Sequence, residues 1–260
     1  MKINKEQFKI ILSKNVNDLK SYCHLELVKS GYSEFEIIGN ETDEDPGYLF
    51  AKGELPVLLV AHLDRQSQLE KCDAVNVLGK KIYIIDTDLI AEEDKGNKWS
   101  HPEQICGDDR CGVYLILELI KKYKTSVLFT DKEEGYPYGR TKFQNSKYLD
   151  FVKNDIKYMC QIDRCGNNDI VYYDSKKNGT EPQEFKKYIA NATGYKEAIG
   201  TMTDIVELTN WTGVSSFNIS CGYYNEHHLD EYISLSDMLK TYNSLDKLLS
   251  DISNAKIYRI

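Results

Sequence analysis

The chain has 260 residues and a mass of 30.0 kDa, of which 41% are hydrophobic and 28% charged. This composition is ordinary for a globular protein with a sizeable core, and it excludes a disordered chain. A formal net charge of −8 argues against non-specific binding to nucleic acid or to an anionic membrane surface.

Hydrophobic spacing in the first half predicts one long helix followed by strands. Residues 5–29 are predicted to be helical, because Phe8, Ile11 and Leu12 share one helix face. A polar turn at 40–47 precedes two strands. The second, 56–62, is almost continuously apolar, which is typical of a strand buried on both faces. A strand pair follows at about 75–88, with its turn at 79–80.

The second half alternates helices with short apolar strands. We predict helices at 110–123, 142–154 and 203–210, strands at 126–130, 156–163 and 214–221, and a last helix from about 235. Ser234 and Asp237 form a capping-box pattern at the start of that last helix. The alternation predicts an α/β sandwich around a mainly parallel sheet, with residues 1–260 as a single domain.

The chain start and the cysteines bear on the compartment. No apolar run approaches 18 residues, and the lysine-rich start has no apolar signal core. The seven cysteines include no C-x-x-C pair and are too dilute for a disulfide scaffold. We therefore expect a soluble, cytoplasmic protein without a membrane or nucleic-acid partner.

Acidic residues and histidines recur at the carboxyl ends of the predicted strands or at a helix start. Binding sites of open α/β sheets form beyond the carboxyl ends of the strands. Each cluster alone has an ordinary structural explanation, such as a helix cap or a solvated surface. One shared site accounts for all of them together. The clusters are His62 with Asp64, Asp108 with Asp109, Glu133 with Glu134, Asp163, and His227.

The order of these motifs resembles that of the co-catalytic di-zinc exopeptidases. This superfamily includes zinc aminopeptidases, peptidase T and the carboxypeptidase G group. The resemblance covers about residues 56–235 and implies a three-layer α/β/α sandwich around a mixed, mainly parallel sheet. A softer match is the segment Gly200-Thr-Met-Thr-Asp204. The motifs are His62-Leu-Asp64, Asp108-Asp-Arg-Cys-Gly112, Glu133-Glu134, Asp163 and His227-His-Leu-Asp-Glu231.

The resemblance implies a metal-binding role for five residues. Asp108 would bridge two Zn²⁺ ions, for which Co²⁺ or Mn²⁺ are possible substitutes, and the Asp108–Asp109 peptide would be cis. The other ligands would be His62 and Asp163 for one ion, and Glu134 and His227 for the other, with His228 as the alternative to His227. Three protein ligands per ion leave a position open for water.

Two acidic residues receive catalytic roles from the same resemblance. Glu133 would be the general base, which takes a proton from the attacking water and delivers it to the leaving amine. Asp64 would lie behind His62 and hold its ring in one tautomer.

The short gaps between His62 and Asp108, and between Asp163 and His227, leave no room for the lid or oligomerisation domain of several branches.

These features predict a metal-dependent exopeptidase, either an aminopeptidase or a di- or tripeptidase. The alternatives are a deacylase of N-acyl amino acids on the same fold and a non-catalytic binding relative.

Four of the five arginines lie beside the motifs. They either balance the carboxylates or supply a fork for a substrate carboxylate. The candidate substrate-binding residues are Arg140, Arg164 and Asp204; the other two arginines are Arg65 and Arg110. The oligomeric state stays open.

Overall fold

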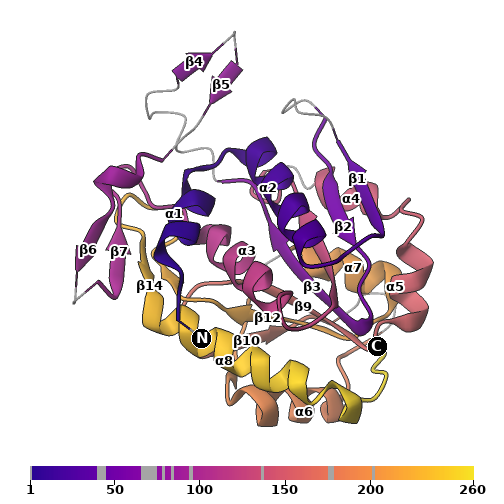
Figure 1. Ribbon diagram of the computed structural model, residues 1–260. Helices are drawn as coiled ribbons and strands as arrows, with labels where there is room; N and C mark the ends of the chain where they lie inside the picture. Colours follow the sequence, from indigo (N-terminus) through magenta and orange to yellow (C-terminus); the bar gives the residue numbers. More distant parts are fainter. Residues whose placement is uncertain are drawn as a thin grey trace.

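The computed structural model describes residues 2–39, 45–65, 75–77, 80–82, 85–93, 96–135, 138–174, 179–200 and 203–260. Its centre is an eight-stranded sheet in the order β1-β2-β8-β3-β9-β12-β10-β11 (Figure 1). The strands are β1 (Phe35–Ile38), β2 (Tyr48–Ala51), β3 (Leu55–His62), β8 (Thr125–Thr130), β9 (Tyr158–Arg164), β10 (Asp169–Tyr172), β11 (Lys196–Glu197) and β12 (Ser216–Ser220).

The middle of this sheet is parallel and its flanks are mixed. Strands β8, β3, β9 and β12 run parallel to one another. Strand β2 pairs antiparallel with β8 and with β1, and β10 pairs antiparallel with β12. The predicted mixed, mainly parallel sheet is therefore confirmed. Because the four central strands share one direction, their carboxyl ends meet at one edge.

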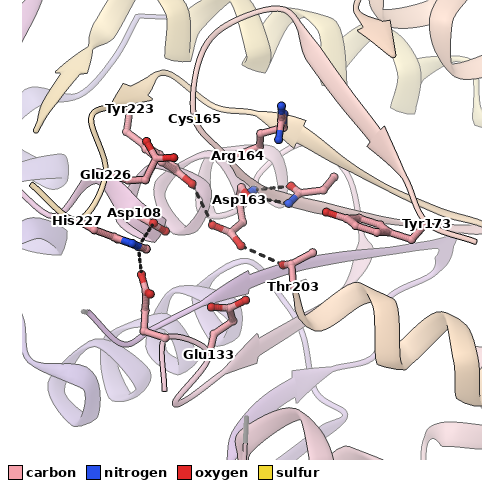
Figure 2. A pocket seen from close by; sticks show the side chains of 12 residues that line it. Asp108, Glu133, Asp163, Arg164, Cys165, Tyr173, Thr203, Tyr223, Glu226 and His227 are labelled. Carbon is pink, nitrogen blue, oxygen red and sulfur yellow. Dashed lines mark hydrogen bonds and ion pairs between the residues drawn. The ribbon is translucent and has the colours of Figure 1, made fainter. Parts of the chain in front are cut away.

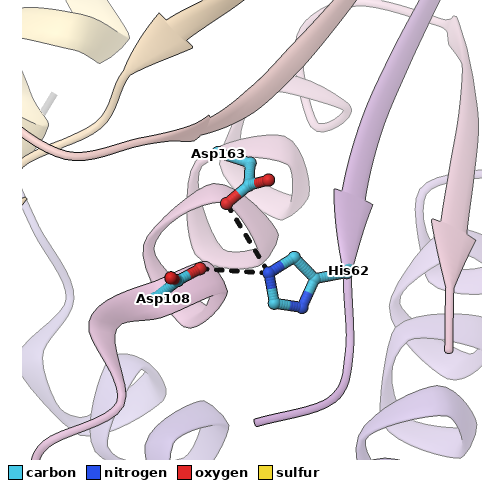
Figure 3. A group of neighbouring side chains, drawn as sticks. All are labelled: His62, Asp108 and Asp163. Atoms are coloured by element: carbon cyan, nitrogen blue, oxygen red, sulfur yellow. Dashed lines mark hydrogen bonds and ion pairs between the residues drawn. The ribbon is translucent and has the colours of Figure 1, made fainter. Parts of the chain in front are cut away.

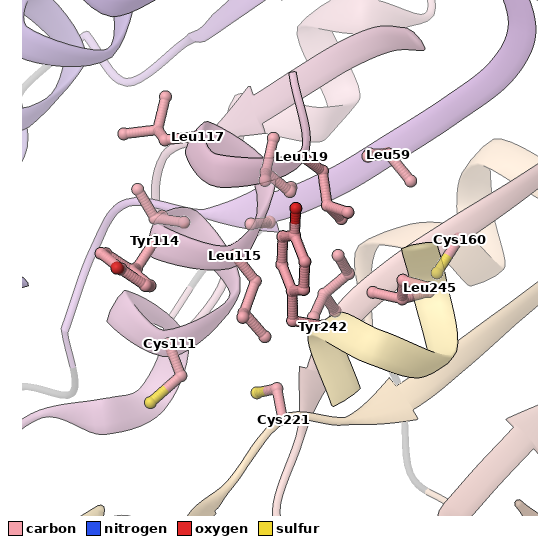
Figure 4. Packing of buried hydrophobic residues seen from close by; sticks show 14 of the residues in the cluster. Leu59, Cys111, Tyr114, Leu115, Leu117, Leu119, Cys160, Cys221, Tyr242 and Leu245 are labelled. Atoms are coloured by element: carbon pink, nitrogen blue, oxygen red, sulfur yellow. The ribbon is translucent and has the colours of Figure 1, made fainter. Parts of the chain in front are cut away.

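Helices cover both faces of the sheet. In β3, Leu59 and Ala61 pack into one apolar cluster, whereas Leu58 and Val60 pack into another. The first cluster lies under α1 (Lys5–Ser13), α2 (Val16–Lys29), α3 (Gly107–Leu119), α6 (Gln183–Thr193) and α8 (Leu235–Ser250). Figure 4 shows α3 and α8 meeting over the sheet in this cluster. The second lies under α4 (Tyr138–Phe143), α5 (Leu149–Asp155) and α7 (Asp204–Thr212). The result is a three-layer α/β/α sandwich.

A smaller sheet lies beside the carboxyl edge of the large one. Its order is β13-β14-β7-β6, with β6 (Ala91–Glu93), β7 (Lys98–Ser100), β13 (Tyr223–Tyr224) and β14 (Tyr232–Ser234). Strands β13 and β14 bracket the loop 225–231, so this sheet fixes both ends of that loop. The remaining short elements are the strand pair β4 (Val75–Val77) and β5 (Lys80–Ile82), and the 3₁₀ turns η2 (Thr87–Leu89) and η3 (Ile252–Asn254).

Two helix predictions were wrong in the same way, because each predicted helix is two helices. Between α1 and α2 the backbone of Lys14 is extended, and the Asn15 side chain accepts a hydrogen bond from the Asp18 backbone N–H at 2.9 Å. Between α4 and α5 the Ser146 hydroxyl accepts from the Tyr148 backbone N–H at 3.0 Å. Such local side-chain bonds compete with the helical backbone pattern and start a new helix.

The other predicted elements are present, whereas α6 and the strands β1, β6, β7, β10, β11, β13 and β14 were missed. The strand pair is confirmed as β4 and β5. Of its predicted turn 79–80, residue 79 lies outside the described residues and Lys80 begins β5; residues 40–44 of the polar turn also lie outside them. The last helix begins as predicted, with the Ser234 hydroxyl accepting from the Asp237 backbone N–H at 3.4 Å. None of the helices in the described part of the chain is long and apolar enough to cross a membrane.

One buried carboxylate away from the carboxyl edge predicts how stability depends on pH. Glu181 is 2% exposed and accepts a hydrogen bond from the Ser216 backbone N–H at 2.7 Å. Burial raises its pKa to about 7, above the value of roughly 4.3 expected in the unfolded chain. A folded-state pKa that is raised means that stability is lost as pH rises from the unfolded value through the folded one.

We therefore expect Glu181→Gln to be more stable than the wild type at pH 8, by up to roughly 3 kcal/mol, and to match it near pH 4. Glutamine keeps the acceptor oxygen for Ser216 and removes the buried charge. Urea unfolding across this pH range measures the difference. Glu184→Gln is the control, because Glu184 is an exposed carboxylate that pairs with Lys256 at 2.9 Å. A difference that does not grow with pH would contradict the assignment.

Candidate metal centre

The predicted site residues gather at the carboxyl edge of the parallel strands. Six of them line a cavity of about 130 Å³, and these are Asp108, Glu133, Glu134, Asp163, Arg164 and His227 (Figure 2). His62 is the last residue of β3, Asp163 lies near the end of β9, and Glu133 follows β8. The lining residues are Asp108, Glu133, Glu134, Asp163, Arg164, Cys165, Tyr173, Thr203, Asn218, Tyr223, Glu226 and His227.

Asp108 lies at the centre of the site and faces two histidines with its two oxygens. Its Oδ1 is 3.0 Å from His62 Nε2, and its Oδ2 is 3.1 Å from His227 Nε2. The Asp108–Asp109 peptide is cis, as the resemblance implied. The buried Glu231 carboxylate accepts from the backbone N–H groups of Cys106 at 3.1 Å and of Asp108 at 3.2 Å. Glu231 thus fixes the chain that presents the shared carboxylate.

Each histidine also meets a second carboxylate. Asp163 Oδ1 lies 3.5 Å from His62 Nε2, and Glu134 Oε1 lies 2.9 Å from His227 Nε2. Figure 3 shows Asp108 and Asp163 facing the same nitrogen of His62. The ligand atoms of His62, Asp108 and Asp163 lie within 4.8 Å of one another, as do those of Asp108, Glu134 and His227. Imidazole nitrogens and carboxylate oxygens in groups of three are the donor set of catalytic zinc sites. His228 is exposed and belongs to neither group.

Asp64 ties the end of β3 to the loop after β8. Its two oxygens accept from the backbone N–H groups of Glu133 at 2.9 Å and Glu134 at 3.0 Å. Its Oδ1 also lies 3.4 Å from His62 Nδ1. Burial opposes ionisation, but the contact with His62 and the two backbone bonds hold the pKa of Asp64 below its ordinary value. One carboxylate therefore holds the backbone of both glutamates and lies beside the His62 ring.

Burial and the repulsion between neighbouring carboxylates raise the pKa of the acidic residues Glu133 and Asp163. Burial raises the pKa of Glu133 to about 9, and the nearby charge of Asp163 adds to the shift. Burial likewise raises the pKa of Asp163 to about 7. Hydrogen bonds with Asp108 and Glu134 raise the pKa of His227 to about 10. A cation bound between these groups would relieve the repulsion among the carboxylates.

Only one of the four arginines near the motifs lines the cavity, and it is Arg164. Arg65 and Arg110 instead donate to the carbonyl oxygen of Lys14, between α1 and α2, at 3.0 and 3.1 Å. Arg65 also donates to the carbonyl of Leu12. Both guanidinium groups therefore connect the α1–α2 junction to the chain segments that carry His62 and Asp108.

Arg140 and Asp204 do not lie where a substrate-binding role requires. Both side chains are buried, and Arg140 Nη1 donates to Asp204 Oδ1 at 3.0 Å. The Thr130 hydroxyl donates to the other oxygen of Asp204. The two charges neutralise each other, and neither residue lines the cavity. Of the three candidate substrate-binding residues, Arg164 alone lines the cavity in the described part of the chain.

Several lining residues were missed from sequence. Asn218 lines the cavity, and Gln161 donates to the lining residue Asp163. Both are polar residues within runs predicted as apolar central strands, and that exception to the pattern could have identified them. Glu226 directly precedes His227 in the chain and received no role. Tyr173 and Tyr223 carry no local pattern that marks them. Residues 201–202 of the Gly200–Asp204 segment lie outside the described residues.

Comparison with known proteins shows which solved structures share this fold. No family model and no curated protein matches the sequence. Solved peptidase structures do match. Aminopeptidase PepT from Bacillus cereus is 10% identical, with a TM-score of 0.64 over 95% of this chain and 97% of that one. Aminopeptidase APDkam598 from Desulfurococcus kamchatkensis is 15% identical, with a TM-score of 0.60 over 96% and 97%. A Zn-dependent exopeptidase from Parabacteroides distasonis is 12% identical, with a TM-score of 0.59 over 96% and 95%. At these identities, the likeness establishes a shared α/β/α fold.

Proposed function

We propose that this protein is a metal-dependent exopeptidase that hydrolyses short peptides through a two-metal centre. The observation that carries the proposal is the position of Asp108, whose two oxygens each face a different histidine, with a further carboxylate beside each histidine. The solved structures that share the fold are named as aminopeptidases, a tripeptidase and a Zn-dependent exopeptidase, which supports this reaction class.

The donor chemistry fits two zinc ions. The proposed ligands are His62, Asp108 and Asp163 for one ion, and Asp108, Glu134 and His227 for the other, all with nitrogen or oxygen donors of the type that zinc prefers. Bound ions supply Lewis-acid activation of the attacking water and of the scissile carbonyl. The same donors accept Co²⁺ or Mn²⁺.

The protein's own groups supply the proton transfers. Glu133 lines the cavity, belongs to neither ligand group and follows the same buried strand as Glu134. We assign it as the general base, which takes a proton at its carboxylate from water and returns it to the leaving amine. Asp64 holds the backbone of both glutamates, so it keeps the base and a ligand in fixed relation.

The cavity supports a short substrate and a catalytic domain without a lid. Its volume of about 130 Å³ is well below the roughly 300 Å³ at the lower end of drug-sized ligand pockets. The described residues between Asp163 and His227 belong to the two sheets, their covering helices or the connections between them.

Metal analysis, together with digestion of peptides that have free and blocked amino ends, tests the proposal. A requirement for a blocked amine would favour a deacylase of N-acyl amino acids.

Arg164 is the proposed contact for a substrate carboxylate. Its Nη2 donates to Asp169 at 3.2 Å, and the guanidinium has further N–H groups to offer at the cavity. We expect Arg164→Ala to raise KM for a free dipeptide by about 10- to 100-fold, the value of one or two charged hydrogen bonds. The C-terminal amide of the same dipeptide should be hydrolysed as by the wild type.

The comparison of these two substrates isolates the carboxylate contact. Arg259→Ala is the matched control, because Arg259 donates to the backbone carbonyls of Tyr258 and Lys153 and does not line the cavity. Arg259→Ala should leave the KM for the dipeptide and the hydrolysis of its amide as in the wild type. Equal losses on the dipeptide and its amide in Arg164→Ala would contradict carboxylate recognition and leave the exopeptidase proposal standing.

A further inference from the structure

The Asp163 carboxylate is hydrogen-bonded by three other side chains. Its Oδ2 accepts from Gln161 Nε2 at 2.9 Å and from the Thr203 hydroxyl at 3.1 Å. Its Oδ1 accepts from the Tyr223 hydroxyl at 3.2 Å and faces His62 Nε2 at 3.5 Å. Figure 2 shows the bonds from Thr203 and Tyr223 reaching the two oxygens from different directions. The two oxygens of one carboxylate therefore have different environments.

The direction of the Gln161 amide is fixed by the backbone. Gln161 is fully buried in β9, and its Oε1 accepts from the Ile205 backbone N–H at 2.8 Å. A backbone N–H can only donate, so the amide oxygen must face Ile205 and the NH₂ group must face Asp163. Gln161 thereby joins the first turn of α7 to the carboxylate at the end of its own strand.

Thr203 and Asn218 prevent the carboxylate from turning. Thr203 directly precedes α7 and is 4% exposed, so its hydroxyl approaches Oδ2 from a fixed helix end. Asn218, on the neighbouring strand β12, accepts from the Asp163 backbone N–H at 3.0 Å and donates to its carbonyl at 2.6 Å. Both the main chain and the side chain of Asp163 are held by residues outside the two metal-ligand groups.

We infer that Gln161 and Thr203 are positioning residues that occupy Oδ2 of Asp163, so that this carboxylate offers a metal ion only Oδ1. A carboxylate oxygen has about two lone-pair sites, and both sites of Oδ2 are filled by protein donors. A bidentate carboxylate would add a ligand atom to the ion, whereas a monodentate one preserves the open position that catalysis requires. This inference rests on the proposed metal centre and adds two residues that determine its coordination number.

Isosteric variants of Thr203 give the cleanest test. Thr203→Val removes the hydroxyl and keeps the shape, while Thr203→Ser keeps the hydroxyl and is the matched control. In the full chain loaded with Co²⁺, we expect Thr203→Val to bind the ion about 10- to 100-fold more weakly, as for other residues that orient metal ligands. The visible absorption of bound Co²⁺ should also weaken, because intensity falls as coordination number rises. Thr203→Ser should resemble the wild type in both.

Two further measurements make the result decisive. The double variant Gln161→Met/Thr203→Val frees both sites on Oδ2 and should show the larger spectral change, with thermal unfolding confirming that it is folded. Repeating the spectra in a His227→Ala background restricts binding to the group that contains Asp163. Unchanged spectra and affinity in Co²⁺-loaded Thr203→Val would overturn this inference alone. A wild type that binds no Co²⁺ would overturn the metal centre, and the inference with it.

Discussion

Replacing Glu133 with glutamine should lower kcat for peptide hydrolysis by about 10²- to 10⁴-fold, which is the usual contribution of a positioned general base. Glutamine has the same shape but cannot take a proton from water. Because Glu133 belongs to neither ligand group, the variant should bind metal like the wild type. The backbone N–H of residue 133 should still be held by Asp64. Steady-state kinetics and metal analysis of the same preparation measure both properties.

The neighbouring glutamate provides the matched control. Glu134→Gln makes the same chemical change one residue along, but Glu134 Oε1 lies 2.9 Å from His227 Nε2 in the second ligand group. This variant should lose activity together with metal. If Glu133→Gln kept wild-type kcat, the general base would have to be another residue. If Glu133→Gln lost metal instead, Glu133 would be a ligand and not the base.

Asp108→Asn is expected to remove both ions, whereas His227→Ala should remove only one. Asp108 is the residue common to both ligand groups, and its two oxygens lie at similar distances from the two histidines. Asparagine offers one neutral acceptor oxygen, so one group loses the shared donor and the other keeps only an uncharged, weaker one. Metal per chain after dialysis should fall from about two ions to near zero for Asp108→Asn, and to about one for His227→Ala.

The control for this comparison is another acid of the same cavity. Glu226 lines the cavity but belongs to neither ligand group, so Glu226→Gln should keep two ions per chain. Two ions retained in Asp108→Asn would show that Asp108 is not shared. Equal losses in Asp108→Asn and His227→Ala would show that the two sites fill only together.

The position of the site could be predicted from sequence because parallel strands have a direction. Apolar runs such as 56–62 identify the central strands, and the polar residues that follow them must meet where the strands end. His62, Asp163 and Glu133 were placed correctly for this reason. The choice of His227 over its neighbour His228 came from the spacing to Glu231, and the structure places His227 beside Asp108.

Other features depended on contacts between segments far apart in the chain. Arg140 was grouped with the site because it lies near Glu134 in sequence, but its partner is Asp204, which no local pattern connects to it. The break between α1 and α2 did have a local signal, Asn15 three residues before Asp18, which is weak beside a continuous hydrophobic pattern. Gln161 could be noticed as a polar residue in a core strand, but its bond with Ile205 depends on the docking of α7.

The junction between α1 and α2 gives the first residues of the chain an importance that their sequence does not show. Arg110 is fully buried, and its Nη2 donates to the carbonyl of Lys14, which Arg65 also contacts. Removing α1 with Lys14 by proteolysis or truncation would remove the carbonyl acceptor of both guanidinium groups, and each lost hydrogen bond from a charged group costs about 1.5–3 kcal/mol. The segments that carry His62 and Asp108 would then lose their support. A chain shortened past residue 14 would keep every proposed ligand and still fail to assemble the centre.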